Sequence, residues 1–145
     1  MSESRTILLV DDEPGIVKMV GRRLEFEGYK VHLAMDGQEA MDKVVETMPS
    51  LVILDIMLPK LNGYEVCKWL KEDERFRKIP VILFTAMTQQ KDKRFGFACG
   101  ADAYLCKPFR THELLDKVAE LMPGGAGAVE KMSEKKEDVK GEVER

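Results

Sequence analysis

The stretch LVILDIMLPKLNG, residues 51–63, decides the fold. It begins with an uninterrupted apolar run from Leu51 to Leu54, and the run ends in the carboxylate of Asp55. A short apolar run without polar alternation is typical of a strand covered by helices on both faces. Turn-favouring residues, Asn62 and Gly63 among them, follow in a predicted loop. The stretch therefore predicts a central strand of a parallel sheet, with a carboxylate at its C-terminal end.

Similar strand patterns recur along the chain, and segments with apolar residues at helical spacing separate them. Strands are predicted at Ile7–Val10, Val31–Leu33, Leu51–Leu54, Val81–Phe84 and Tyr104–Leu105. Helices are predicted from Pro14 to Gly28, from Asp36 to Pro49, around Val66 to Leu70, from about Lys91 to Cys99 and from Thr111 to Met122. Asp36 and Glu39 are spaced like a capping box, and Thr111 is the expected cap of the last helix.

This alternation predicts an α/β fold with a doubly wound, five-stranded parallel sheet and five helices, because each parallel connection needs a crossover. We expect residues 1–122 to form this domain. Residues 123–145 contain no aromatic residue and few apolar ones, so we expect a charged flexible tail or linker stub. A conditional docking helix is the alternative for the tail, although Lys136 and Gly141 interrupt its apolar stripe.

The composition excludes several functional classes. The 145 residues are 44% hydrophobic, an ordinary composition for a globular protein. Their formal charge of −3 gives no electrostatic reason to expect direct binding of nucleic acid or of an anionic membrane. The longest apolar runs are far shorter than the ~20 residues that span a bilayer. We therefore expect a cytoplasmic protein. Its three cysteines lack CxxC spacing, which favours free thiols over a disulfide framework or a zinc site.

Polar residues directly follow the predicted strands, namely Asp11 and Asp12, Asp55, Thr85 and Lys107. The C-terminal ends of parallel strands meet at one edge of a sheet, so we expect these side chains to gather there. Three neighbouring carboxylates are best tolerated with a hard divalent cation, and Mg²⁺ is the natural candidate. The lysine and the threonine hydroxyl can hold phosphoryl oxygens. The carboxylate that ends the central strand is the candidate nucleophile, which would form an aspartyl phosphate.

Four segments at these strand ends together resemble one known family. They are DD at 11–12, LVILDIMLPKLNGYE from Leu51, VILFTA from Val81 and GADAYLCKPF from Gly100. In this order they are similar to the receiver domain of two-component response regulators, and in size the chain is similar to the single-domain chemotaxis regulators. The resemblance covers residues from about 5 to 122. It implies a flavodoxin-like strand order of 2-1-3-4-5.

The resemblance also implies roles for the acidic residues. Asp55 would accept a phosphoryl group from a histidine kinase, a phosphotransfer protein or a small phosphodonor. Asp12, Asp55 and the backbone carbonyl of Met57 would bind Mg²⁺ directly, and Asp11 would act through water. The chain would be a phosphoacceptor that assists its own phosphorylation and dephosphorylation, rather than an enzyme that turns over a substrate.

Three further residues would carry the response. Lys107 would pair with the phosphoryl group, Thr85 would swing to hydrogen-bond it, and Tyr104 would change rotamer with it. An output partner would then read the face formed by the fourth helix, the fifth strand and the fifth helix, with the chain as a monomer or a phosphorylation-dependent dimer. The bond between Lys107 and Pro108 is typically cis in this family.

Two other functional classes compete with this interpretation. A haloacid-dehalogenase-like phosphatase or phosphotransferase also uses an aspartyl nucleophile, but it usually carries a general acid two residues later, where this chain has Met57. A pure interaction module that has lost phosphorylation is the other alternative, and the complete set of site residues argues against it. Met57 and Met87 border the expected path of the hydrolytic water, so we expect slow loss of the phosphoryl group.

Overall fold

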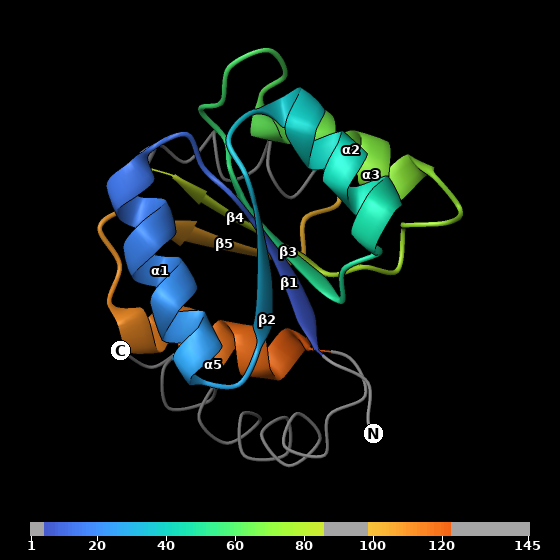
Figure 1. Cartoon of the computed structure of the whole chain (residues 1–145). Coiled ribbons are helices and arrows are strands. Elements are labelled where there is room, and N and C mark those ends of the chain that lie inside the picture. Colours follow the sequence, from blue (N-terminus) through green and yellow to red (C-terminus); the bar gives the residue numbers. More distant parts are fainter. Residues whose placement is uncertain (1–4, 86–98, 123–145) are drawn as a thin grey trace, which may run out of the picture.

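The computed structural model describes residues 5–85 and 99–122 (Figure 1). The elements are β1 (Thr6–Val10), α1 (Pro14–Phe26), β2 (Lys30–Ala34), α2 (Gly37–Thr47), β3 (Leu51–Asp55), α3 (Gly63–Glu72), β4 (Val81–Thr85), β5 (Ala103–Cys106) and α5 (Thr111–Leu121). The helix predicted from about Lys91 lies, up to residue 98, outside the described residues, as does the tail predicted for 123–145. Within the described ranges, no helix is long and apolar enough to cross a membrane.

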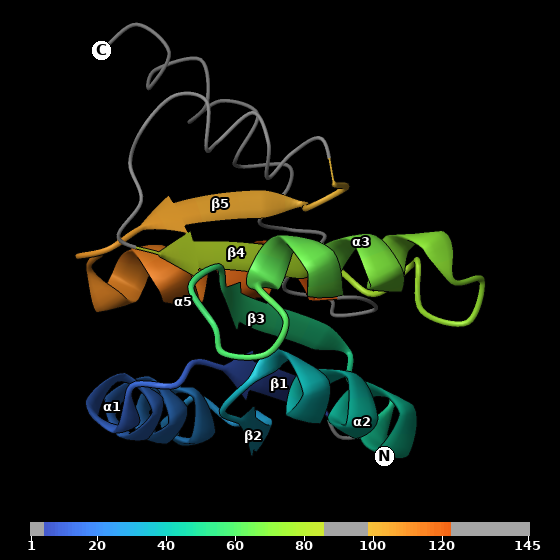
Figure 2. The same ribbon diagram turned by 90° about the horizontal axis from the view of Figure 1, so that it is seen from above.

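The five strands form one parallel sheet, as the sequence predicted. Their order is β2-β1-β3-β4-β5, which Figure 2 shows from above. Every neighbouring pair is parallel, including β1 with its partners on both sides. All five residues of β3 are buried, which confirms that this strand is central. The C-terminal ends of β1, β3, β4 and β5 therefore point to the same edge of the sheet.

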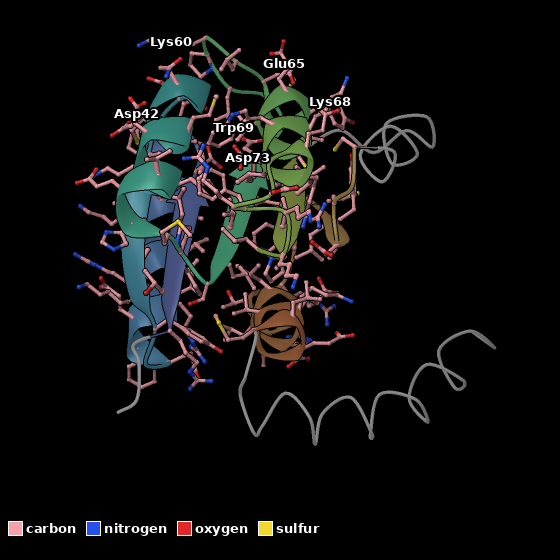
Figure 3. All side chains as sticks on the ribbon, turned by 90° about the vertical axis from the view of Figure 1, so that its right-hand side faces the viewer. Asp42, Lys60, Glu65, Lys68, Trp69 and Asp73 are labelled. Atoms are coloured by element: carbon pink, nitrogen blue, oxygen red, sulfur yellow. The ribbon has the colours of Figure 1, made fainter. Side chains whose placement is uncertain are left out.

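Successive residues of the buried strands alternate between two cores. Helices α2 and α3 cover one face of the sheet, and α1 and α5 cover the other (Figure 1). Figure 3 shows α2 and α3 side by side, with α5 on the opposite side of the strands. The strand residues of the first core include Leu8, Val10, Val52, Leu54, Val81 and Leu83. Those of the second core include Ile7, Leu9, Leu51, Ile53, Ile82 and Phe84. Each such buried side chain contributes about 1.5–3 kcal/mol, so the strands that carry the site are the most strongly held parts of the fold.

A capping box of Asp36 and Glu39 would consist of two hydrogen bonds at the start of α2, and the structure contains one of them. The side chain of Asp36 accepts a hydrogen bond from the backbone N–H of Glu39 at 2.7 Å. The Glu39 carboxylate, however, accepts from the N–H of Met35 at 2.8 Å rather than from Asp36. The helix ends at Thr47, and Met48 follows with a left-handed φ of 46°. Asp36 is thus a true N-cap, while Glu39 ties down the residue before it.

Two helix starts differ from the sequence prediction. Helix α3 already begins at Gly63, because Asn62 and Glu65 form a capping box in which each side chain accepts from the other's backbone N–H. The sequence placed Asn62 and Gly63 in the loop instead. Helix α5 begins at Thr111 itself, with Arg110 as the N-cap, so the prediction that Thr111 caps this helix was wrong.

Close packing at Gly37 and Gly63 fixes the loop between β3 and α3. A Cβ atom at Gly63 would lie 2.3 Å from the backbone oxygen of Asp55, and one at Gly37 would lie 2.2 Å from the backbone oxygen of Leu61. The N–H of Gly63 also donates to the oxygen of Ile56 at 2.9 Å. No side chain fits at either position without movement of the backbone. The loop that follows Asp55 is therefore clamped against the first turns of α2 and α3.

Asp36→Ala is predicted to lower the free energy of unfolding by about 1 kcal/mol, because the mutation removes the cap of α2. Asp36→Asn keeps the capping oxygen and should retain most of that stability, although it loses the exposed ion pair with Lys60. Urea unfolding followed by circular dichroism measures both changes. Asp42→Ala, an exposed change on the same helix, is the control and should stay within about 0.5 kcal/mol of wild type. Equal losses in the two Asp36 variants would contradict the capping role.

A candidate phosphoryl site at the edge of the sheet

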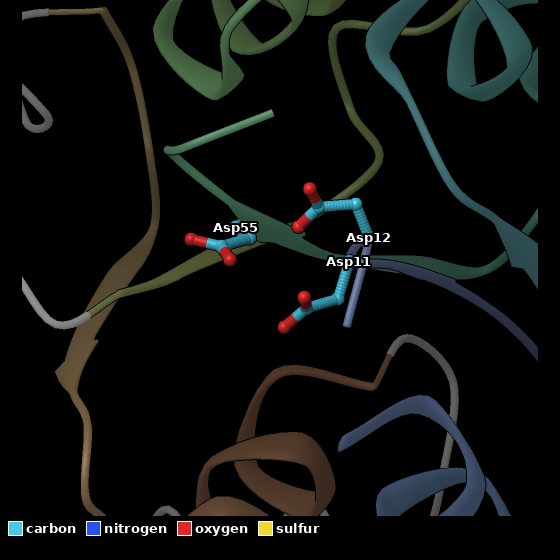
Figure 4. A group of neighbouring side chains, drawn as sticks. All are labelled: Asp11, Asp12 and Asp55. Atoms are coloured by element: carbon cyan, nitrogen blue, oxygen red, sulfur yellow. The ribbon is translucent and has the colours of Figure 1, made fainter. Parts of the chain in front are cut away.

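The acidic residues predicted to gather do come together. Asp11 and Asp12 directly follow β1, and Asp55 is the last residue of β3. One carboxylate oxygen from each of the three lies within 4.8 Å of the others (Figure 4). Strands β1 and β3 are neighbours with Val10 paired to Leu54, so the sheet register itself places these side chains side by side.

Lys107 holds two of these carboxylates. Its Nζ lies 2.9 Å from Oδ2 of Asp11 and 3.1 Å from Oδ2 of Asp55. The exposed carboxylate of Glu13 is farther away, at 3.9 Å. The same Nζ lies 4.9 Å from the centre of the Phe84 ring, which covers it from the side of the core. The lysine is therefore mostly buried and is bonded to residues from two different strands.

The second oxygen of each buried carboxylate accepts a backbone hydrogen bond from two residues further along. Oδ1 of Asp11 accepts from the N–H of Glu13 at 2.9 Å, and Oδ1 of Asp55 accepts from the N–H of Met57 at 3.2 Å. Such local bonds satisfy a carboxylate and fix its rotamer. In both residues one oxygen faces Lys107 while the other is held by the chain. The orientation of Asp55 is thus set before any ligand arrives.

The electrostatics of the site reflect its burial. Desolvation of Asp55, followed by the nearby charge of Asp11, raises the pKa of Asp55 above its ordinary value, although Lys107 opposes both effects. Burial alone lowers the pKa of Lys107, but its hydrogen bonds and charge interactions with Asp11 and Asp55 outweigh this and hold that pKa above its ordinary value. The surroundings of Lys107 therefore favour its ammonium form, whereas those of Asp55 disfavour its carboxylate form.

A cavity of about 810 Å³ opens over this cluster. It is lined by residues that include Asp12, Glu13, Asp55, Met57, Asn62 and Lys107. The three carboxylates differ in how they meet solvent, because Asp12 is exposed whereas Asp11 is fully buried and Asp55 nearly so. Met57 is 61% exposed. Asp12 and Asp55 thus face the cavity, and Asp11 supports them from beneath.

The two predicted switch residues lie on neighbouring strands. Strand β4 ends at Thr85, whose backbone pairs in register with Cys106 at the end of β5. The Thr85 side chain, like Met87, is outside the described part of the chain. Tyr104 lies in β5, half-buried against the core under α2 and α3. The bond between Lys107 and Pro108 is cis, as the resemblance implied.

Sequence reasoning missed six residues of this site, namely Glu13, Ile56, Leu58, Pro59, Asn62 and Tyr64. Glu13 and Tyr64 line the cavity, and so does Asn62, which the sequence assigned only to a loop. A signal for Glu13 existed, since it extends the acidic pair after the first strand. The spacing of Asn62 and Glu65 could have revealed the capping box that brings the start of α3 to the cavity rim. The sequence contains no comparable signal for Tyr64.

Comparison with known proteins identifies the family. The model of the response regulator receiver domain matches residues 7–119. The chain belongs to this family. Receiver domains are phosphorylation-dependent signalling switches that bind Mg²⁺ at a cluster of aspartates, and Asp11, Asp12 and Asp55 form such a cluster in this receiver.

Relatives of this receiver include longer regulators. The DNA-binding dual master transcriptional regulator RpaA of Synechocystis sp. is 46% identical over 116 residues, which are 80% of this chain and 48% of the relative. The alkaline phosphatase synthesis transcriptional regulatory protein PhoP of Bacillus subtilis is 37% identical over 140 residues, 97% of this chain and 58% of the relative. The chain therefore spans about half the length of the curated relatives it matches.

A solved structure confirms the fold. The putative response regulator from Chloroflexus aurantiacus superposes with a TM-score of 0.79 at 32% identity. The superposition covers 83% of this chain and 98% of that structure. The described receiver thus matches nearly the whole of a solved homologue.

Asp55→Asn is predicted to raise the free energy of unfolding at pH 7 in buffer with EDTA. The native state holds the Asp55 proton more tightly than the unfolded chain, so the stability that this raised pKa provides is present below the ordinary Asp pKa of about 4. It is lost as the pH rises through the native pKa. Asparagine imitates the protonated carboxyl at every pH, and its advantage should shrink at about pH 3.5. Urea unfolding at both pH values measures this difference.

Two further variants serve as controls. Lys107→Met should lower the free energy of unfolding at pH 7 by on the order of 3 kcal/mol, because it leaves Asp11 and Asp55 without their buried cation. Asp12→Asn, at an exposed carboxylate, should change stability less than either variant. A loss of stability in Asp55→Asn at pH 7 would contradict this account of the site.

Proposed function

We propose that Asp55 is the phosphoacceptor of this receiver. The observation that carries the proposal is the position of its carboxylate, which ends the central strand, lines the cavity and lies 3.1 Å from the ammonium group of Lys107. A nucleophilic carboxylate needs access to the donor, a fixed orientation and a nearby positive charge for the incoming phosphoryl oxygens. Asp55 has all three.

We further propose that Asp12, Asp55 and the backbone carbonyl of Met57 bind Mg²⁺ directly, and that Asp11 acts through water. The exposure of Asp12 at the cavity and the burial of Asp11 against Lys107 support this division. Carboxylate and carbonyl oxygens are ligands that suit this hard cation, which usually keeps several waters. When bound, the cation neutralises charge on the acidic cluster and on the phosphoryl group.

The transfer forms one bond and breaks one. An oxygen of Asp55 attacks the phosphorus of a phosphohistidine or a small phosphodonor, the new O–P bond forms, and the bond to the donor breaks with its electron pair remaining on the donor. Lys107 then exchanges its contact with Asp55 for the new phosphoryl oxygens. Its second contact, to Asp11, keeps the ammonium group in place during this exchange. The receiver thus assists its own modification, and later its own dephosphorylation.

The response passes through Thr85 and Tyr104 in this proposal. Thr85 hydrogen-bonds the phosphoryl group, and Tyr104 changes its rotamer on the adjacent strand. The register of β4 and β5 supports such coupling, because Leu83 pairs with Tyr104 and Thr85 with Cys106. A charge shifts an equilibrium only when it interacts differently with the two states, and this pair of residues provides that difference. The altered surface includes β5, α5 and the helix predicted from about Lys91.

Partners follow from the same proposal. The phosphodonor is a histidine kinase or a phosphotransfer protein, and an output protein binds the altered surface. Direct binding of nucleic acid is not expected of this domain, although RpaA is described as DNA-binding and is about twice as long as the matched region. A monomer, or a dimer that forms on phosphorylation, is compatible with this role.

Incubation of the purified chain with an acyl phosphate and Mg²⁺ is predicted to add one phosphoryl group per molecule. Intact-mass spectrometry should detect this group, and treatment with hydroxylamine should remove it, as is typical of an acyl phosphate. Asp55→Asn should abolish the labelling. Omission of Mg²⁺ or Asp12→Asn should reduce it strongly, because each removes part of the proposed metal site.

Two results would contradict this proposal. Repeated turnover of phosphate esters that requires Asp55 would favour the phosphatase class instead. An unchanged mass, under conditions that label another receiver completely, would favour an interaction module that is not phosphorylated.

Met57→Asn is predicted to shorten the lifetime of the phosphorylated chain several-fold. Met57 is exposed at the cavity and cannot orient a hydrolytic water by a strong hydrogen bond, whereas an amide can. Loss of the phosphoryl mass with time, after removal of the donor, measures the rate. Met57→Leu is the matched control and should decay at the wild-type rate. The prediction would be refuted if Met57→Asn and Met57→Leu lost the phosphoryl group at the same rate, and if a second polar substitution at Met87 also failed to accelerate the loss.

A further inference from the structure

Helix α3 is attached to the chain that leads into β5 by side chains from one of its faces. Cys67 and Lys71 are one turn apart in α3 and therefore share a face. Nζ of Lys71 lies 3.0 Å from Oδ2 of Asp102, and the same Oδ2 accepts from the N–H of Val81 at 2.8 Å. These two contacts hold Asp102, the residue before β5, against α3 and the start of β4.

Cys67 and Cys99 meet within this contact. The Cys67 thiol donates a hydrogen bond to the carbonyl oxygen of Cys99, with 3.7 Å between Sγ and that oxygen. Cys67 is fully buried, whereas Cys99 is partly exposed. The described residues include all three cysteines of the sequence, and none of them is in a disulfide. The sequence spacing gave no sign of this proximity.

The backbones of α3 and of residues 99–102 approach each other closely beside the two cysteines. One turn along α3 from Cys67, a Cβ atom built on Gly100 would lie only 3.2 Å from Cβ of Lys71. The Cβ atoms of a disulfide are typically 3.5–4.5 Å apart. Glycine with a φ of +99° permits this approach. The two backbones therefore lie in close contact directly beside Cys67 and Cys99, and Sγ of Cys67 already reaches the backbone of Cys99.

The two thiols differ in reactivity in the way that a redox pair needs. The interaction with the Cys67 side chain lowers the pKa of Cys99, and the charge of Lys71 contributes in the same direction. The interaction with Cys99, together with burial, raises the pKa of Cys67. Oxidation-sensitive cysteines are typically accessible, have thiolate character and lie beside a second cysteine that resolves the product. Cys99 fits the first role and Cys67 the second.

We propose that Cys67 and Cys99 form a reversible disulfide when the chain meets hydrogen peroxide. The Cys99 thiolate attacks one peroxide oxygen, the O–O bond breaks, and hydroxide leaves as a sulfenic acid forms on Cys99. The Cys67 sulfur then attacks the Cys99 sulfur. The sulfenic hydroxyl leaves with the Cys67 proton as water, so two thiols lose two electrons and the peroxide is reduced.

The cross-link joins residues 32 positions apart and encloses β4 between them. It ties α3, whose first residue packs on the backbone of Asp55, to the segment that leads into β5 and Lys107. Oxidation would therefore restrict movement of the segment that leads to Lys107 relative to α3 and Asp55. The formation of the disulfide does not itself depend on Asp55 or on any phosphoryl group, so it is a second input that is separate from the proposed function.

The test treats the full chain with hydrogen peroxide, blocks the remaining thiols by alkylation and maps the peptides by mass spectrometry without reduction. We expect one intramolecular disulfide between Cys67 and Cys99, loss of two thiols per molecule, an alkylated Cys106 and full reversal by dithiothreitol. Cys99→Ser should form no disulfide, and its Cys67 thiol should remain reduced after peroxide treatment. Cys67→Ala should leave a sulfenic acid at Cys99 that a dione probe captures.

Matched variants make the result decisive. Cys106→Ser should still form the disulfide, and so should Asp55→Asn, which separates this test from that of the phosphoacceptor. Three alkylated cysteines after oxidation would overturn the proposal, and so would a disulfide between two chains or one that includes Cys106. Capture of the sulfenic acid at Cys99 in Cys67→Ala, with the wild type remaining fully reduced, would also overturn it.

Discussion

The ion pair of Lys107 with Asp11 and Asp55 is the interaction on which the rest of the site depends. Two carboxylates that are buried side by side repel each other, and neither strand could end in this way without a cation between them. Lys107 reaches them only because β5 lies in the sheet at the correct register, two strands away from β3. The charge balance of the site therefore depends on the strand order. A different order would remove Lys107 from Asp11 and Asp55 and leave buried charges without a partner.

Burial divides the acidic cluster into a part that lies beneath the cavity and a part that faces it. Asp11 lies beneath the cavity and is bonded to Lys107 and to the backbone, so its role is to hold the ammonium group. Asp12 and Asp55 face the cavity, where a ligand can reach them. The clamped loop after Asp55 adds a fixed wall, because Gly63 packs directly on the Asp55 backbone. The site is preorganised by backbone contacts and not by its charged side chains alone.

The sequence predicted the strands and the gathering of Asp11, Asp12, Asp55 and Lys107 because these depend on apolar runs and on the ends of parallel strands. The strand order came from the resemblance to receiver domains. It could not predict the different burial of Asp11 and Asp12, which depends on the direction in which each side chain leaves the strand end. It misplaced the starts of α3 and α5, where neighbouring residues compete to cap the helix. The contact of Cys67 with Cys99 was invisible because packing, not spacing, creates it.

The complete burial of β3 also has a consequence for motion. Amide protons of a central strand exchange with solvent only when much of the domain opens, whereas those near a sheet edge exchange through smaller openings. We therefore expect Asp55 to lie on the slowest-exchanging strand of the described sheet, while Lys107 follows β5, the outermost strand on its side. In the proposed function the acceptor is thus a fixed reference point, and we expect movement in response to modification at the edge of the sheet, where it disturbs the fewest hydrogen bonds.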